Sequence, residues 1–381
     1  MKIIKKLPDP FRKRDGNRVC DVEDWQLRRE EIKDMMLNIQ YGTMPGPPDR
    51  MNIKKLEKNI IGEDEVIETI HFEFIPRQDR PDIKFGMDVT VLIPSKEAIK
   101  QKKKQIEDFG KDGLPCVIYV GGRALFDLSD EGYMVISYQN TQLEPDKMGN
   151  PIIGPAQSAY EDAYPEINHS WGSIAVWTWG GMRMVDYALT RKDVNPNQII
   201  ISGHSRNGKT ALLAGALDER ISIVNPAGSG CAGAGSYLIL GDNCEDLAAL
   251  TGRDRWWAWT HPDFEKWADR EQDLPFDQHF LMGLVAPRPL IRVEGDSDEW
   301  ANPKGTSCTF LATEPIYEFL SAKRRNGIFY HKGGHQHTDE DRQILMKFAE
   351  DYFFKGESGR KFKDIIIDPS LKSEFMDWQK P

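Results

Sequence analysis

The 381-residue sequence lacks the features that would direct it to a membrane. No stretch approaches the ~20 consecutive apolar residues that a membrane-spanning helix needs. Residues 1–16 are charged and punctuated by proline, without the apolar centre of a signal peptide. As the sequence stands we expect a soluble, cytoplasmic protein without a membrane partner, or a secreted or periplasmic one if a leader peptide has been removed.

Paired cysteines and a surplus of basic charge are missing as well. The five cysteines are an odd number without paired spacing, so neither a disulfide framework nor a zinc knuckle is indicated. The formal net charge of −10 argues against nucleic acid as a partner, because phosphate binding requires a basic surface. We interpret the lysine-rich run 100–104 as a solvated helix or loop.

What the chain does contain is an alternation of strand-like and helix-like segments. Continuous apolar runs at 116–120 and 133–138 are typical of strands that are buried on both faces. Internal repeats and low-complexity linkers are absent. We expect one domain over 1–381, with an N-terminal extension over 1–60 that packs on the core and a glycine- and tryptophan-rich cap insertion at 226–275.

A serine at a sharp strand-to-helix turn is the strongest local signal. Residues 199–209 read I-I-I-S-G-H-S-R-N-G-K, so a β-branched run breaks at Gly203, delivers Ser205 into a turn and continues into an apolar stretch. Such a nucleophile elbow holds the hydroxyl clear of the sheet and points the first helical N–H groups at a developing oxyanion. The second glycine is Gly208, which gives G-x-S-x-x-G instead of the usual G-x-S-x-G.

An acid and a histidine follow later in the chain, each directly after a predicted strand. The strand at 289–295 leads into Asp298, and the strand at 327–330 leads into His335. Serine, acid and histidine in this order are typical of the α/β-hydrolase triad. We therefore predict an α/β-hydrolase fold, a three-layer αβα sandwich with a mainly parallel central sheet and inserted cap segments, and a catalytic Ser205.

Neighbouring residues leave alternatives open. Asp296 could replace Asp298 as the acid, and His337 could replace His335 as the base. The histidine-rich tail could instead hold a metal ion, since its spacings of four and two can surround one ion. The Gly-Gly pair before His335 and a helix expected to begin near Thr338 favour the catalytic interpretation, so we expect neither a metal nor a cofactor.

Ten stretches, in order along nearly the whole chain, carry a resemblance to a known family. They are L-P-D-P-F (7–11), W-Q-L-R-R-E-E-I (25–32), Y-G-T-M-P (41–45), W-T-W-G-G-M-R-M-V-D-Y (177–187), G-H-S-R-N-G-K (203–209), A-L-D-E-R (216–220), S-G-C-A-G-A (229–234), L-P-F-D-Q-H (274–279), A-P-R-P-L (286–290) and D-E-W-A-N-P-K-G (298–305). These stretches resemble the glucuronoyl esterases of carbohydrate esterase family 15, especially the bacterial members. The resemblance implies hydrolysis of the ester between (4-O-methyl-)glucuronic acid of glucuronoxylan, or a uronate-ester oligosaccharide, and a lignin-type alcohol.

The resemblance also implies roles around the elbow. Ser205 attacks the C6 carbonyl of the esterified glucuronic acid, and the backbone N–H and guanidinium of Arg206 stabilise the oxyanion. Lys209 corresponds to a family lysine that hydrogen-bonds sugar hydroxyls, and Trp300 to a tryptophan that packs beside the sugar. We also expect Trp257, in the inserted segment, to contact the substrate.

Two positions depart from the family pattern. Some members carry the triad acid as a glutamate within P-x-E-S-G, but this chain has Gly228 there, so the acid must come from the loop after Val293. Members often place a glutamate near Gly241 to contact the sugar. Here Asp242 is the candidate, with Glu245 as the alternative.

Two other functions remain compatible with the sequence. One is an acetyl or other acyl esterase of carbohydrates with the same fold. The other is a catalytically silent sugar-binding relative, which the complete set of serine, acid and histidine disfavours. The sequence leaves the alcohol, the 4-O-methyl preference and the oligomeric state open.

Overall fold

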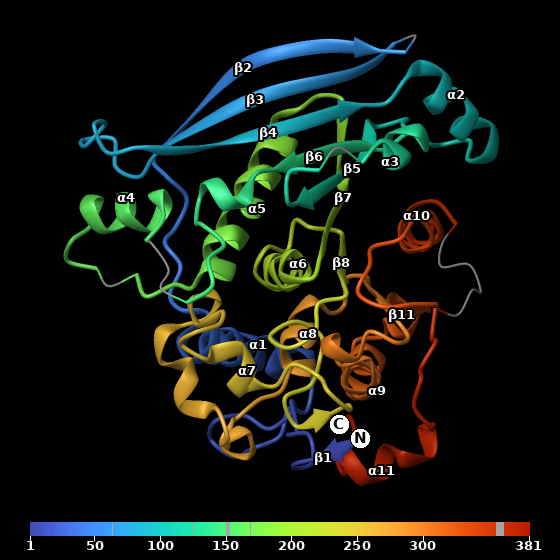
Figure 1. Ribbon diagram of the computed structural model, residues 1–381. Helices are drawn as coiled ribbons and strands as arrows, with labels where there is room; N and C mark the ends of the chain where they lie inside the picture. Colours follow the sequence, from blue (N-terminus) through green and yellow to red (C-terminus); the bar gives the residue numbers. More distant parts are fainter. Residues whose placement is uncertain (63, 124, 150–152, 168, 356–361) are drawn as a thin grey trace.

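A nine-stranded mixed sheet forms the centre of the molecule (Figure 1). The computed structural model describes residues 1–381 except 63, 124, 150–152, 168 and 356–361. The sheet order is β11-β10-β8-β7-β5-β6-β4-β3-β2, and β1 pairs with β9 separately. The strands are β1 (Lys2–Ile3), β2 (Arg50–Ile61), β3 (Glu65–Ile75), β4 (Phe85–Ile93), β5 (Leu114–Val120), β6 (Met134–Tyr138), β7 (Val194–His204), β8 (Ile223–Ala227), β9 (Ile239–Leu240), β10 (Leu290–Gly295) and β11 (Asn326–His331). Strands β11 through β6 pair in parallel, whereas β4, β3 and β2 run antiparallel to their neighbours.

Helices cover both faces of the parallel strands. The helices are α1 (Val22–Met36), α2 (Lys96–Gln105), α3 (Phe126–Asp130), α4 (Pro155–Ala163), α5 (Ser173–Thr190), α6 (Arg206–Leu217), α7 (Leu247–Thr251), α8 (His279–Val285), α9 (Pro303–Phe319), α10 (Asp339–Phe353) and α11 (Lys372–Phe375). Short turns of helix are η1 (Leu37–Tyr41), η2 (Asn140–Gln142), η3 (Trp257–Trp259), η4 (Pro262–Trp267), η5 (Glu271–Asp273), η6 (Glu299–Ala301), η7 (Lys323–Arg325) and η8 (Pro369–Leu371). In Figure 1, α5, α6 and α9 lie on one face of the sheet and α3 and α10 on the other. The predicted αβα sandwich is confirmed.

The composition of the central strands explains why the αβα sandwich could be predicted from the sequence. Every residue of β5 and β6 is buried, as expected for parallel strands covered by helices on both faces. Buried apolar side chains form one continuous set that extends from Leu7 to Trp378. Among the described residues, no helix combines the length and the apolar composition that crossing a membrane would require.

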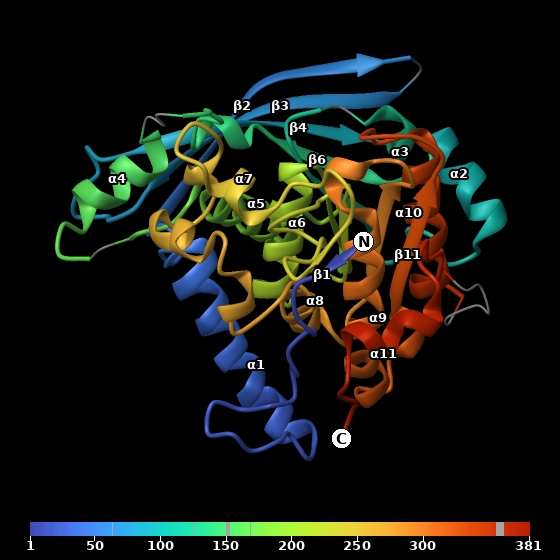
Figure 2. The same cartoon turned by 60° about the horizontal axis from the view of Figure 1, so that its bottom comes forward.

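The N-terminal region differs from the prediction at β2. This strand joins the outer edge of the main sheet (Figures 1 and 2), so the extension that packs outside the sheet ends before Arg50. Every residue of β2 except Met51 is exposed, and the strand therefore lacks the alternation that reveals a half-buried strand. Lys54, Lys55 and Lys58 place charges along this edge strand, which discourages pairing with other chains.

The prediction of a solvated lysine run is also wrong in part. The run lies in α2, where Lys102 is only 4% exposed. Its ammonium group donates to Glu350 Oε1 at 2.8 Å and also to Glu131. A buried ammonium group requires such partners, and the ion pairs tie α2 to α10.

The inserted segment lies between β8 and β10. It contains β9, α7, η3, η4, η5 and α8, and these short elements are connected by loops. The chain ends meet below it: the Leu7 N–H donates to the Phe375 carbonyl and Trp378 Nε1 donates to the Leu7 carbonyl, both at 2.8 Å. Residues of the insertion and of the elbow line one cavity at the carboxyl ends of the parallel strands.

Candidate active site

Ser205 lies in a strained turn between β7 and α6. Its backbone has φ 61° and ψ −126°, a conformation that a non-glycine residue adopts only where the surrounding structure enforces it. A Cβ at Gly203 would lie 2.3 Å from the Asn207 carbonyl oxygen, and one at Gly208 would lie 2.6 Å from the Ala227 carbonyl oxygen. The wider G-x-S-x-x-G spacing therefore places its second glycine where α6 approaches β8.

His335 connects Ser205 to an acid. Its Nε2 lies 2.8 Å from Ser205 Oγ, and its Nδ1 lies 2.6 Å from Asp298 Oδ2. Asp298 is 4% exposed and also caps η6. With the carboxylate accepting from Nδ1–H, the neutral imidazole offers Nε2 as an acceptor to the serine hydroxyl.

The other candidate acid positions have different surroundings. Asp296 accepts hydrogen bonds from Lys332 Nζ at 2.5 Å and from the Gly333 N–H at 3.1 Å, and Lys332 lowers the pKa of its carboxyl. At Gly228, where φ is +48°, a Cβ would lie 3.7 Å from His335 Cε1. A side chain at that position would therefore stand beside the base, but here the position is empty and Asp298 is the carboxylate in contact with His335.

His337 packs behind His335. The His337 ring stacks on Tyr119 and on His204, with ring centres 6.1 and 5.6 Å apart, and the His204 ring lies 4.7 Å from that of His335. Burial lowers the pKa of His337 to about 3 and that of His204 to about 4, so both rings are uncharged at neutral pH. The ring hydrogen-bonded to Ser205 Oγ is that of His335, and His337 makes no such contact.

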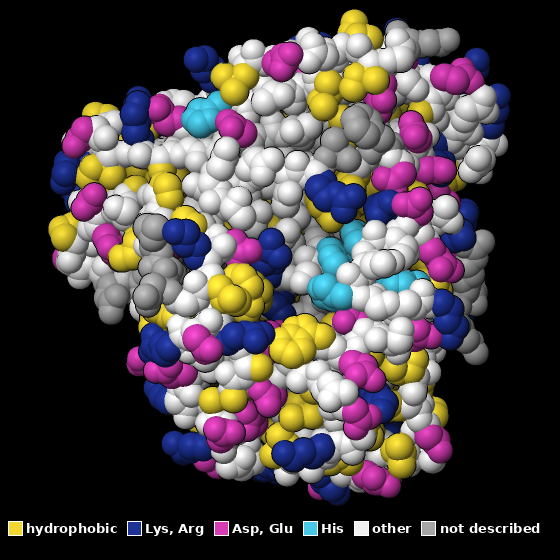
Figure 3. Space-filling view, in the orientation of Figure 1, with side chains coloured by type: hydrophobic (Ala, Val, Ile, Leu, Met, Phe, Trp, Pro, Cys, Tyr) yellow, Lys and Arg dark blue, Asp and Glu magenta, His cyan; other side chains and the backbone are white. Residues whose placement is uncertain are grey.

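Histidines gather beside a hollow in the face shown in Figure 3. The His331 Nδ1 lies 2.9 Å from Asp341 Oδ1, and both side chains are buried. No set of three histidine, cysteine, aspartate or glutamate side chains with metal-binding geometry occurs in the described ranges.

A cavity of about 220 Å³ opens in front of the serine. We call it the Ser205 cavity, and its lining includes Ser205, Arg206, Lys209, Glu245, Trp256, Trp259, Trp300 and His335. Lys209 is 4% and Glu245 5% exposed, so a buried cation and a buried anion form part of its wall. The cation, Lys209, comes from α6 just after the nucleophile, and the anion, Glu245, comes from the inserted segment.

Lys209 is held by three groups. Its ammonium donates to the Ser229 carbonyl at 2.8 Å and to the Cys231 carbonyl at 2.5 Å, and lies 3.6 Å from Glu245 Oε2. The ammonium has three N–H donors, two of which are spent on the carbonyls. The third faces Glu245 at a distance too long for a direct hydrogen bond, so a ligand hydroxyl can bond to both groups.

Asp242, the candidate for the sugar contact, does not line the Ser205 cavity. Its side chain is 64% exposed and pairs with Lys304 at 2.7 Å and with the Met1 amino group at 3.6 Å. The alternative, Glu245, lines the cavity instead because its backbone N–H is anchored on the Trp300 carbonyl at 3.0 Å.

Trp257, which the sequence predicts to contact the substrate, lies outside the Ser205 cavity. Residues three apart share a face of a 3-10 helix, and the rings of Trp256 and Trp259 stack with centres 4.6 Å apart at the Ser205 cavity. Trp257 instead donates its Nε1–H to the Gly149 carbonyl at 2.7 Å and carries the Arg253 guanidinium 4.2 Å from its ring centre. Trp300 lines the Ser205 cavity and is 44% exposed.

Asp146 is a residue of this site that the sequence did not reveal. Its carboxylate lies 2.5 Å from Arg206 Nε and accepts a hydrogen bond from Trp259 Nε1 at 3.0 Å. The guanidinium and the indole are thereby fixed together. No motif surrounds Asp146 in the sequence, so only the fold brings it to the elbow.

Comparisons with known proteins agree with this geometry. The model of the family "Glucuronyl esterase, fungi" matches residues 89–321, more than half of the chain. The 4-O-methyl-glucuronoyl methylesterase of Podospora anserina is 27% identical over 94% of this chain and 70% of its own length.

Solved structures extend the similarity to three dimensions. A family 15 glucuronoyl esterase from Caldicellulosiruptor kristjansonii has a TM-score of 0.77 and 27% identity, and the match covers 96% of each chain. A glucuronoyl esterase mutant from Sporotrichum thermophile, solved with methyl 4-O-methyl-β-D-glucopyranuronate, has a TM-score of 0.74 and 22% identity over 99% of this chain and 96% of that one. This chain is therefore a member of the glucuronoyl esterase family and has its α/β-hydrolase fold.

Proposed function

We propose that the protein is a serine esterase that hydrolyses the ester between 4-O-methyl-glucuronic acid, carried by glucuronoxylan, and an alcohol. The observation that carries the proposal is the pairing of Ser205 with buried Lys209 and Glu245 in one cavity. A plain acyl esterase needs only an oxyanion hole and an apolar slot. A buried donor and acceptor beside the nucleophile suit a ring with several hydroxyls.

In the first half-reaction Ser205 Oγ bonds to C6 of the uronate while its proton passes to His335 Nε2. Asp298 holds the imidazole in the tautomer that can accept this proton and stabilises the imidazolium that forms. The C6–O bond to the alcohol then breaks, and the alcohol oxygen takes the proton from His335. The products of this half-reaction are free alcohol and a uronyl ester of Ser205.

Charge that develops on the C6 carbonyl oxygen is stabilised by Arg206. Its backbone N–H is the first of α6, and its guanidinium is oriented by Asp146. A charged donor is stronger than a neutral one in a partly dry site, and removal of one oxyanion donor typically costs ~3–4 kcal/mol in the activation barrier.

The second half-reaction uses water in place of the alcohol. His335 takes a proton from the water as its oxygen bonds to C6, and returns that proton to Ser205 Oγ as the acyl bond breaks. Uronic acid is released and the serine is restored.

A substrate panel tests the proposal. We expect the protein to hydrolyse methyl 4-O-methyl-glucuronate with a higher kcat/KM than acetylated xylose, and we expect the folded Ser205→Ala variant to lose at least a thousandfold in kcat. A preference for the acetylated sugar would assign the protein to the acetyl esterases of the same fold. Retention of most of the activity by Ser205→Ala would show that another residue is the nucleophile.

A further inference from the structure

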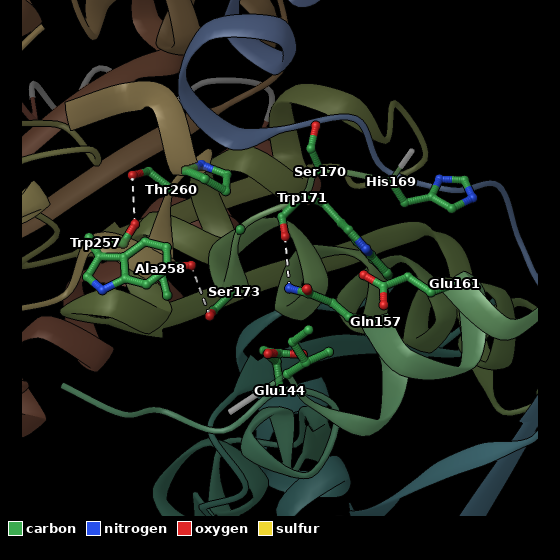
Figure 4. Close-up of a pocket in the computed structure, with 13 residues that line it drawn as sticks. Glu144, Gln157, Glu161, His169, Ser170, Trp171, Ser173, Trp257, Ala258 and Thr260 are labelled. Carbon is green, nitrogen blue, oxygen red and sulfur yellow. Dashed lines mark hydrogen bonds between the residues drawn. The ribbon is translucent and has the colours of Figure 1, made fainter. Parts of the chain in front are cut away.

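A second cavity lies next to the Ser205 cavity on the other side of η3. It measures about 290 Å³, near the lower end of the range for small-molecule sites, and we call it the Glu144 cavity (Figure 4). Trp257 lines the Glu144 cavity while Trp259 lines the Ser205 cavity. These tryptophans belong to the same 3-10 turn, so η3 contributes to the wall of both cavities.

Glu144 gives the second cavity an unused hydrogen-bonding group. This glutamate is 3% exposed, and its Oε1 accepts from the Gly154 N–H at 2.9 Å. Its Oε2 has no partner within the described part of the chain, although a buried polar atom without a partner is costly. Gln157 and Glu161 on α4 face the same space in Figure 4.

The electrostatics of the Glu144 cavity exclude an anion. Its described lining contains the carboxyls of Glu144 and Glu161 but no lysine or arginine, and burial lowers the pKa of its one histidine, His169. Burial raises the pKa of Glu144 to about 7, so near neutral pH this group can donate as well as accept. A second uronate is therefore disfavoured, and an uncharged ligand with hydroxyl groups is favoured.

Two tryptophans form the aromatic part of the remaining wall. Trp257 and Trp171 contribute indole surfaces, and Trp257 is held by its bond to Gly149 and by the Arg253 guanidinium over its ring. Aromatic surface opposite hydrogen-bonding carboxyl and amide groups matches a sugar ring, which has apolar faces and hydroxyls at its edge.

We propose that the Glu144 cavity is a second subsite, which binds an uncharged pyranose residue of the polysaccharide whose uronate ester lies at Ser205. This assignment rests on the proposed function, because the pyranose belongs to the polymer whose uronate ester is bound at Ser205. It also assigns Trp257 to the polymer and not to the uronate ring.

The experiment uses calorimetric titration of the Ser205→Ala protein with a linear β-1,4-linked xylo-oligosaccharide. We expect saturable binding that weakens at least tenfold when Glu161→Ala or Trp257→Ala is added. Asp162→Ala is the matched control, because Asp162 is exposed on the same helix and does not line the cavity; it should leave the affinity unchanged. In the Ser205 enzyme, Glu161→Ala should lower kcat/KM for an oligosaccharide-linked uronate ester about tenfold more than for methyl 4-O-methyl-glucuronate.

Two results of the titration would overturn the proposal: no binding of the oligosaccharide, or binding that neither Glu161→Ala nor Trp257→Ala weakens. A third would be displacement of the bound oligosaccharide by a neutral aryl alcohol, if the same two variants abolish binding of that alcohol. The last result would assign the cavity to the aromatic alcohol of the ester. Turnover of methyl 4-O-methyl-glucuronate by the wild type is measured in parallel. Its loss would contradict the proposed function, whereas its presence without oligosaccharide binding would contradict only the second subsite.

Discussion

Asp298 and Asp296 are two residues apart, yet they have opposite surroundings. Asp298 is buried against His335, whereas Asp296 is paired with Lys332, a side chain that is 95% exposed. Only the first carboxylate can fix the imidazole tautomer and stabilise its protonated form. Although they lie on one loop, Asp298 therefore has a catalytic role and Asp296 forms a surface ion pair.

This difference leads to a paired mutational prediction. We expect Asp298→Asn to lower kcat by at least a hundredfold, because an amide in place of the carboxylate favours the wrong tautomer of His335. Asp296→Asn should change kcat less than threefold. Steady-state kinetics on methyl 4-O-methyl-glucuronate would show the difference, and a larger loss in Asp296→Asn would contradict the assigned acid.

Glu144 has a consequence for stability as well as for binding. Its pKa is about 7 in the folded protein and 4.5 when it is free, so the folded state binds more protons between these pH values. Stability then falls as the pH rises from 4.5 to 7. The loss is on the order of 3 kcal/mol at full effect, since one pKa unit corresponds to about 1.4 kcal/mol.

Glu144→Gln tests this effect, because the amide keeps the shape and does not titrate. Relative to this variant, the wild type should lose stability as the pH rises through the 4.5 to 7 window in urea unfolding experiments. Parallel stability curves for the two proteins over that window would show that Glu144 does not have a raised pKa.

At the scale of elements, the ion pairs of Lys102 connect α2 to the body of the molecule. We expect Lys102→Met to lower the free energy of unfolding by about 1–2 kcal/mol, less than for a fully buried pair, because Glu131 is 47% and Glu350 13% exposed. Lys103→Met, on the exposed side of α2, should stay within about 0.5 kcal/mol of the wild type. If chemical denaturation gave the same loss of unfolding free energy for both variants, the ion pairs of Lys102 would not stabilise the fold.

Two kinds of feature could be predicted from the sequence: strands that are buried on both faces, and the turn that places a catalytic residue directly after a strand. The apolar runs of β5 and β6 and the elbow at Ser205 are such cases. β2 could not be predicted. Neither of its faces is buried, so burial imposes no alternation of apolar and polar residues along its whole length. The sequence does not show that residues 257–259 form a 3-10 turn, and this turn determines which of the neighbouring tryptophans line the Ser205 cavity.

Contacts across long sequence separations were beyond the sequence for a different reason. Asp146 meets Arg206, and Glu245 meets Lys209, only once the fold is complete. Local patterns report periodicity and turns, not which loops converge at the carboxyl ends of the strands. The departure at Gly228, by contrast, was visible in the sequence and directed attention to Asp298.

In the proposed reaction, protein side chains carry out every step of ester hydrolysis. Both ring nitrogens of His335 and of His331 already have protein partners: His335 contacts Ser205 and Asp298, and His331 contacts Asp341 and the Gly334 carbonyl. We expect activity to survive prolonged treatment with EDTA within about twofold. A loss that added zinc restores would revive a metal site in the histidine-rich tail.

In the proposed function, the residues beside the nucleophile recognise a sugar. Lys209→Met removes the donor that faces Glu245, and Trp300→Ala removes an exposed aromatic wall. A buried group left without its hydroxyl partner costs ~1–3 kcal/mol, which corresponds to roughly 5-fold to 150-fold in rate. A small activated ester such as p-nitrophenyl acetate has no hydroxyls to lose.

The most direct measurement is the ratio of kcat/KM for methyl 4-O-methyl-glucuronate to kcat/KM for p-nitrophenyl acetate, in the wild type and in these two variants. We expect this ratio to fall at least about fivefold in both variants while hydrolysis of the acetate is largely retained. An unchanged ratio, with both activities reduced in equal proportion, would contradict it.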